Sequence, residues 1–215
     1  MSTPTLDLAR FYIRELTSDD DSLVKPFACD DDDLDDFLRT DALRLQEQHV
    51  VRTYLGLYDN ELAGYISLLA DVLELKTGEK KKLTLSYSDH PMVPALKIAR
   101  LAVAKHLRTK LRGFGTELVR FAHDKALNLA EGVGCRLLTV DAYPRAVEFY
   151  QKLGFLRSKV QKERKRTAPV VEGAVVEGAV VEGAVVEGAV GHETPSMWLD
   201  LFAPNPPPWV SGADM

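Results

Sequence analysis

Cysteine is scarce in this sequence, with only Cys29 and Cys135 among 215 residues. They lie far apart and lack the close spacing of metal ligands, so the sequence predicts neither a disulfide framework nor a metal site. No apolar run approaches the roughly 20 residues that a membrane helix needs, and the first residues lack the basic start and apolar core of a signal peptide. We therefore expect a cytoplasmic protein with two reduced thiols and no membrane contact.

Positive charge is missing from the last part of the chain, and the net charge of -5 conceals a strong segregation. Residues 1–75 carry 6 lysines and arginines against 17 acidic residues, residues 76–166 carry 21 against 8, and residues 167–215 carry none against 7. A basic middle between acidic ends predicts that an anionic ligand, if the protein has one, meets the middle segment. Charge alone is equally compatible with an ordinary solvated surface.

Hydrophobic periodicity predicts a single α/β domain around a mixed sheet. Strands are expected at 11–16, on both sides of the Asp59-Asn60 turn within 50–75, at 97–104, at 135–142, from Phe155 onward and at 196–202. Helices are expected within 29–49, at 116–131 and at 144–154. The aspartates at 30–33 would cap the first of these helices. Residues 76–96 are polar, basic and interrupted by prolines, so we expect a long surface connection there.

Four copies of Val-Val-Glu-Gly-Ala fill residues 170–190. A period of five matches neither a helix nor a strand, so we expect a tandem expansion within the last hairpin, without a catalytic role. The proline-rich tail should be extended and loosely held. The predicted organisation is an N-terminal extension at 1–10, a domain at 11–202 with this insertion, and a flexible tail at 203–215.

A glycine-rich stretch at 112–116, Arg-Gly-Phe-Gly-Thr, lies between a predicted strand and a predicted helix. Glycines let a phosphate approach the backbone, and the N–H groups and dipole of a helix start favour an anion. The lysine of a P-loop is missing after Gly113, and Leu118 stands where the dinucleotide fingerprint has its third glycine. Taken alone, the stretch is either a phosphate loop or a plain helix start.

Three pieces in order carry a resemblance to a known family: Ala-Arg-Leu-Ala-Val at 99–103, the glycine-rich loop with its helix, and VDAYPRAVEFYQKLGF at 140–155. Over about residues 11–160 plus the final strand, the chain resembles the GNAT superfamily of acyl-CoA-dependent N-acetyltransferases. Residues 27–43 and 52–68 are similar to a branch that includes small cytoplasmic acetyltransferases and toxins that acetylate aminoacyl-tRNA. The resemblance implies a mixed, mostly antiparallel central sheet flanked by helices, with the repeats inserted in the last hairpin.

The resemblance also implies roles for individual residues. Tyr150 matches the family's tyrosine that protonates the departing CoA thiolate, a role that suits a phenol with a pKa of about 10; its alternative is a packed aromatic beside Phe149. Backbone groups of strand 99–103 would contact the pantetheine arm, and the amides from 112 to 116 would hold the pyrophosphate with help from nearby cations. The residues expected to bind acetyl-CoA are Leu101, Val103, Arg108, Lys110, Arg112, Gly113, Phe114, Gly115 and Thr116.

The sequence departs from the family pattern in front of this loop. Lys110 stands where glutamine or arginine is usual, and the run from Val103 to Gly113 is about two residues longer than usual, so Arg108 is a second candidate for that position. Tyr143-Pro144 replaces an asparagine found in many relatives. No carboxylate is singled out as the general base, and His106 is only a conceivable helper.

The sequence thus predicts an enzyme that moves an acetyl group from acetyl-CoA to a primary amine by direct attack. Toxin-like acetylation of aminoacyl-tRNA is an alternative that the basic middle segment favours and the overall acidity opposes. A non-catalytic acyl-CoA-binding module is another. The expected partners are acetyl-CoA and an amine acceptor, with tRNA and a second copy of the chain as further candidates.

Overall fold

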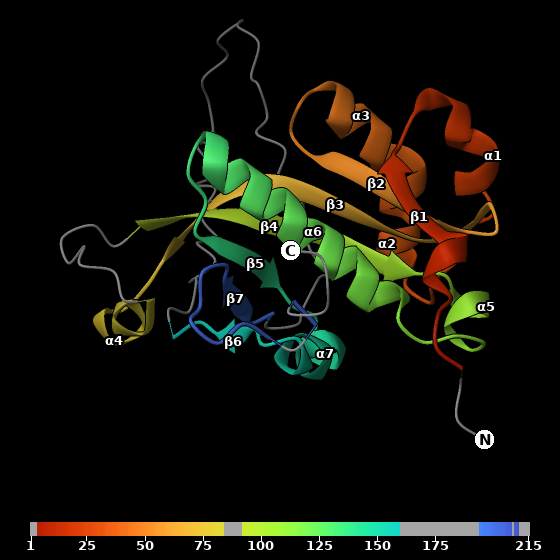
Figure 1. The fold of residues 1–215 in the computed structure, drawn as a ribbon. Helices are drawn as coiled ribbons and strands as arrows, with labels where there is room; N and C mark the ends of the chain where they lie inside the picture. Colours follow the sequence, from red (N-terminus) through yellow and green to blue (C-terminus); the bar gives the residue numbers. More distant parts are fainter. Residues whose placement is uncertain (1–3, 84–91, 160–193, 208, 211–215) are drawn as a thin grey trace, which may run out of the picture.

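The computed structural model describes residues 4–83, 92–159, 194–207 and 209–210, and within these a seven-stranded sheet runs through the molecule (Figure 1). The strand order is β1-β2-β3-β4-β5-β7-β6. All neighbours are antiparallel except β4 and β5, which are parallel. The strands are β1 Phe11–Glu15, β2 Arg52–Tyr58, β3 Glu61–Glu74, β4 Met92–Val103, β5 Leu137–Asp141, β6 Leu156–Arg157 and β7 Ser196–Asp200.

Helices cover both faces of this sheet (Figure 1). Alternate residues of a strand point to opposite faces, and adjacent Tyr65 and Ile66 of β3 accordingly pack into different hydrophobic clusters. The cluster of Ile66 contains α6 and α7, and the cluster of Tyr65 contains α1, α2 and α3. The helices are η1 Leu8–Arg10, η2 Ser18–Asp20, α1 Asp21–Val24, α2 Asp32–Asp36, the π-helical turn η3 Phe37–Asp41, α3 Ala42–Glu47, α4 Thr77–Lys80, η4 Lys81–Leu83, α5 Lys105–Arg108, α6 Phe114–Gly132, η5 Pro144–Ala146 and α7 Val147–Lys152.

The turn between β2 and β3 confirms the predicted hairpin. Asp59 and Asn60 have φ of 51° and 66°, and two successive left-handed residues match the right-handed twist of the flanking strands. The turn pairs Tyr58 with Glu61, but the register shifts between Gly56 and Leu57 before it continues to Arg52 opposite Leu68. The polar pair therefore sets only the register next to the turn, because the bulge changes which side chains of the rest of the hairpin face each helical layer.

Strands β4 and β5 are paired over only part of their length. Residues 95–98 of β4 pair with 137–140 of β5, whereas 100–103 pair with β3 alone. The register between β3 and β4 shifts at Ala99, which has no partner on β3. A bulge bends a strand and increases its twist, so the second half of β4 leaves β5 and keeps one backbone edge unpaired by any strand that the structure describes.

The segment expected as a surface connection is more structured than its composition indicates. Residues 92–96 belong to β4, and Leu83 and Glu79 are buried at 1% and 2% exposure. The carboxylate of Glu79 accepts hydrogen bonds from the Trp198 indole at 3.3 Å and from the backbone N–H of Lys76 at 3.1 Å. The prediction was wrong for these residues because charged residues and prolines are typical of loops. Here, however, Glu79 is buried with hydrogen-bond donors and Pro94 lies within β4.

Differences at the chain ends and helix starts are smaller. Helix α6 begins at Phe114, two residues before the expected start, and the helical turns at 18–24 were not predicted. In the tail, the Trp209 indole donates to the Leu153 carbonyl at 2.9 Å, and its ring lies 5.4 Å from His123; this residue is held by specific contacts. The repeat at 170–190 lies outside the described residues. Among the helices of the described part, none is long and apolar enough to cross a membrane.

Candidate active site

The start of α6 presents three backbone amides that have no partner among the described residues. Gly113 caps the helix with φ of 116°, a conformation that disfavours side chains, and no side chain bonds the helix start. Glu117 makes the first helical bond, from its N–H to the Gly113 carbonyl at 3.0 Å. Within the described ranges the N–H groups of Phe114, Gly115 and Thr116 donate to no acceptor. These amides and the dipole of a 19-residue helix form a cradle for an anion.

The end of β4 and the first turn of α7 approach this cradle. A methyl group added to Gly115 would lie 3.2 Å from the Phe149 ring and 3.8 Å from a Val103 methyl group. A side chain at 115 would therefore be in tight contact with the Phe149 ring, which shows how closely helix, strand and α7 pack here. The Phe114 side chain is 2% exposed and contacts the rings of Phe11 and Tyr58, so this residue can offer a ligand only its backbone.

The cations before the loop differ in what they already contact. The residues 105–108 form α5, which accommodates the longer connection after Val103. From it the Arg108 guanidinium and the Lys105 ammonium pair with the two carboxylate oxygens of Asp30 at 2.7 and 2.6 Å. Lys110 and Arg112 are exposed, and neither forms an ion pair with any residue that the structure describes. These two cations are therefore the ones available to a phosphate, whereas Arg108 would first have to leave Asp30.

The backbone of Arg112 differs from the sequence-based expectation. We expected its amide to belong to the cradle, but this N–H donates to the Pro4 carbonyl at 2.9 Å. The carbonyl of Arg112 in turn accepts from the N–H of Leu6, also at 2.9 Å. This amide is therefore already satisfied by the protein itself, and the three amides of the cradle begin at Phe114. The cause is a contact with the N-terminal extension, more than 100 residues away in the sequence.

Tyr150 carries a buried phenol whose hydroxyl donates to no acceptor within the described part of the chain. It lies on α7 with 5% exposure, and its ring contacts Phe149 and Phe155 edge to face at 5.0 and 5.3 Å. Burial raises the pKa of Tyr150 well above its ordinary value, because water no longer stabilises the phenolate. The group keeps its proton at neutral pH, but its raised pKa makes it a weaker acid than a free phenol. Burial alone therefore does not favour the role of proton donor over that of a packed aromatic.

The opposite face of the sheet carries polar groups that the sequence reasoning missed. Arg100 follows the bulge and lies over the Phe37 ring at 5.2 Å, in the layer of α2 and α3. The Arg145 guanidinium lies 5.3 Å from the Tyr143 ring centre and pairs with Asp31. Burial and the charge of Asp31 raise the pKa of Tyr143. Strand alternation between Arg100 and Leu101 is the signal that could have placed Arg100 on this face.

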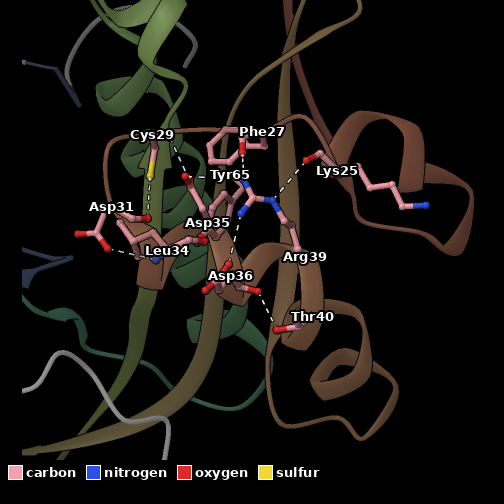
Figure 2. A network of polar contacts seen from close by, with 10 residues as sticks. All are labelled: Lys25, Phe27, Cys29, Asp31, Leu34, Asp35, Asp36, Arg39, Thr40 and Tyr65. Atoms are coloured by element: carbon pink, nitrogen blue, oxygen red, sulfur yellow. Dashed lines mark hydrogen bonds and ion pairs between the residues drawn. The ribbon is translucent and has the colours of Figure 1, made fainter.

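A network of polar contacts fixes the start of α2 on this face (Figure 2). Asp35 accepts from the Cys29 N–H at 3.0 Å, and the Tyr65 hydroxyl donates to the Leu34 carbonyl at 2.7 Å. Arg39 donates to the carbonyls of Phe27 and Lys25 (Figure 2). The loop 25–31 is thereby fixed against α2. His106 instead faces Glu61, with 3.5 Å between Nε2 and a carboxylate oxygen.

Known proteins resemble the chain both in sequence family and in fold. Residues 11–155 match the model of the acetyltransferase (GNAT) family. A tyrosine-to-phenylalanine mutant of the toxin AtaT, bound to the C-terminus of the antitoxin AtaR and acetyl-CoA, has 20% identity over 89% of this chain and 94% of its own, with a TM-score of 0.60. AtaT complexed with acetyl-methionyl-tRNAfMet has 21% identity over 88% of this chain and 94% of its own, with a TM-score of 0.63. A tyrosine-to-phenylalanine mutant of KacT has 18% identity over 89% of this chain and 95% of its own, with a TM-score of 0.65. At these identities the likeness to the solved structures concerns the fold.

Proposed function

The chain belongs to the acetyltransferase (GNAT) family and is an acetyl-CoA-dependent enzyme, and we propose that it acetylates a primary amine by direct attack on the thioester, with Tyr150 as general acid. The proposal includes the pyrophosphate at the start of α6 and the pantetheine arm along the unpaired edge of β4 at Leu101 and Val103. A cytoplasmic location, and a homodimer as the assembly, are further parts of this proposal.

The observation that carries the proposal is a set of backbone groups without strand or helix partners in the described part of the chain, at one edge of β4 and at the start of α6. The half of β4 that pairs with β3 but not with β5 leads to the three amides at the start of α6. Helix α7 brings Phe149, next to Tyr150, close to Gly115. An elongated thioester with a pyrophosphate at one end needs backbone donors along its length and a proton donor near its sulfur. The side chains of Lys110 and Arg112 would add charge beside the pyrophosphate.

The chemistry follows from these positions. The nitrogen lone pair of the amine attacks the thioester carbonyl carbon, a C–N bond forms, and the C–S bond breaks as the thiolate leaves. The Tyr150 hydroxyl transfers its proton to the thiolate and recovers one from solvent, while the amine nitrogen loses its proton to water. Holding the two reactants together supplies a large part of the rate, and the positioned acid contributes about 100-fold or more.

Two measurements test the proposal. Acetyl-CoA at about 100 times its dissociation constant should stabilise the protein by roughly 2.7 kcal/mol, which a thermal-shift titration detects. The substitution Tyr150→Phe should lower kcat by about 100-fold while the dissociation constant for acetyl-CoA stays unchanged. Tyr12→Phe, on the exposed strand β1 and bonded to Asn60 at 3.0 Å, is the matched control and should change neither quantity. Loss of acetyl-CoA binding in Tyr150→Phe would contradict the role of general acid.

The acceptor could be the amino group of an aminoacyl-tRNA. The fold shared with AtaT complexed with acetyl-methionyl-tRNAfMet supports this second candidate, as does the charge of residues 76–166. The structure also supplies a counterargument, because Lys105, Arg108 and Arg145 are paired with Asp30 and Asp31. A comparison of aminoacyl-tRNA with a panel of small amines decides between them: activity on tRNA should fall steeply with added salt. Acetyl-CoA binding without turnover of any acceptor would instead support the non-catalytic alternative.

A further inference from the structure

The N-terminal residues 4–7, here called the strap, lie alongside the loop that precedes α6. Thr5 and Arg112 form a parallel bridge, in which Arg112 N–H donates to Pro4 and Leu6 N–H donates to Arg112, both at 2.9 Å. The peptide groups of Arg112 are thus satisfied on both sides by the strap. We propose that the strap is a positioning element for acetyl-CoA, with Leu6 as the residue that seats the pyrophosphate loop; this inference rests on the proposed function.

Leu6 anchors the strap by burial. It is 7% exposed and packs in a cluster with Tyr58, Ala63, Leu107 and Phe114. A methyl group added to Gly113 would lie 3.4 Å from Leu6 Cβ, so the leucine sits directly beside the glycine that caps α6. The strap continues into η1, where the Asp7 side chain accepts from the Ala9 N–H at 3.1 Å. Leu6 is therefore held through its side chain by the hydrophobic cluster and through its backbone N–H by the loop at Arg112.

The loop needs such support because its direction depends on a glycine. Gly113 has the widest conformational freedom of any residue and no side chain to pack. The peptide just before it is Arg112, which the strap fixes through both hydrogen bonds. The three free amides follow immediately after Gly113, so their orientation toward a phosphate is set by the Arg112 peptide and by the packing of Phe114 against Leu6. An oriented cradle binds more tightly because less ordering remains to occur on binding.

The experiment compares Leu6→Ala with Leu8→Ala in the full chain. Both remove the same atoms, but Leu8 lies just after the strap, in η1, and is 54% exposed. Weakening one charge-assisted bond between an amide and the pyrophosphate corresponds to about a tenfold loss of affinity. We therefore expect Leu6→Ala to raise the KM and the dissociation constant for acetyl-CoA by about tenfold, with kcat at saturation nearly unchanged. Leu8→Ala should behave as wild type, and Leu6→Met should restore most of the affinity.

An acyl donor without a pyrophosphate separates positioning from general destabilisation. Acetyl-pantetheine carries the thioester and the arm but not the phosphates, so its KM should be the same in wild type and Leu6→Ala. Assays at a temperature where circular dichroism shows both proteins folded, together with the milder Leu6→Val, keep the comparison valid if Leu6→Ala folds poorly. An unchanged KM for acetyl-CoA, or an equal loss with both donors, would overturn the inference while leaving the proposed function intact. Failure of the wild type to bind acetyl-CoA would overturn the proposed function and this inference with it.

Discussion

The helices α2 and α6 begin on opposite faces of the sheet. The first turn of α2 is rich in acidic side chains of the protein itself, whereas that of α6 contains one acid. At α2 the Asp31 side chain accepts from the Leu34 N–H at 3.2 Å, and Asp32, Asp33 and Asp35 fill the first turn. At α6 the cap is Gly113, which has no side chain, and Glu117 is the one acid of the first turn. The sequence itself satisfies the first helix start, whereas the second is left for an anion from outside.

The pKa of the Cys29 thiol shows that the start of α2 does not favour a further negative charge. A helix start ordinarily favours a thiolate, yet burial and the neighbouring Asp35 raise the pKa of Cys29 to about 12. Burial, together with Asp35, thus outweighs the helix dipole at this thiol. Two helix starts in one molecule can therefore differ in their capacity for a ligand, and the residues at the cap and in the first turn contribute to this difference.

The strongest test of the comparison removes the feature that keeps the α6 cradle open. Gly113→Val would place a branched side chain at φ of 116° and should destabilise the fold by about 1–3 kcal/mol. Distortion of the loop would also weaken two or more amide bonds to the pyrophosphate, a loss of about 100-fold in affinity for acetyl-CoA. Chemical denaturation and calorimetric titration with acetyl-CoA measure the two effects.

Gly132→Ala is the matched control, at the other end of the same helix. An added Cβ there meets no atom within 4 Å, and alanine favours a helix by up to about 1 kcal/mol over glycine. This variant should be as stable as wild type or slightly more stable, with unchanged affinity for acetyl-CoA. A normal affinity in Gly113→Val would contradict the assignment of the cradle.

A second test removes the side chain that caps the start of α2. Asp31→Ala removes the cap of α2 and the partner of Arg145, and should lower the free energy of unfolding by about 1 kcal/mol. Asp31→Asn retains a capping oxygen, so it should recover most of this loss. Urea denaturation of the three proteins measures the difference, and equal losses in both variants would show that the ion pair, rather than the cap, stabilises the segment.

The same two helix starts show how far the sequence determines the site. The aspartates before α2 and the glycines before α6 have local signals, and so have the Asp59-Asn60 turn and the apolar stripe of α6; all were predictable from spacing and residue type. Which cations already have an ion-pair partner was not predictable, because the partner of Arg108 is Asp30, 78 residues earlier. The bridge from Thr5 to Arg112 has no periodic pattern at all. Local chemistry thus predicts the cradle, and long-range packing decides which of its donors are free.

The smallest expected effect concerns the point where the acidic and basic segments meet. Asp30 pairs with Lys105 and Arg108, and the Lys105 ammonium, followed by Arg108, lowers the pKa of this exposed carboxyl. Asp30→Asn would release both cations toward the α6 cradle, while asparagine tolerates the φ of 70° at this position. We expect acetyl-CoA to bind a few-fold more tightly at low ionic strength and equally at high salt, because salt screens exposed charges. Asp21→Asn makes the same change in net charge but frees Lys25, which directly follows α1, so it should leave the affinity unchanged. An equal gain in both variants would mean that net charge alone, and not the release of Lys105 and Arg108, controls the binding of the anion.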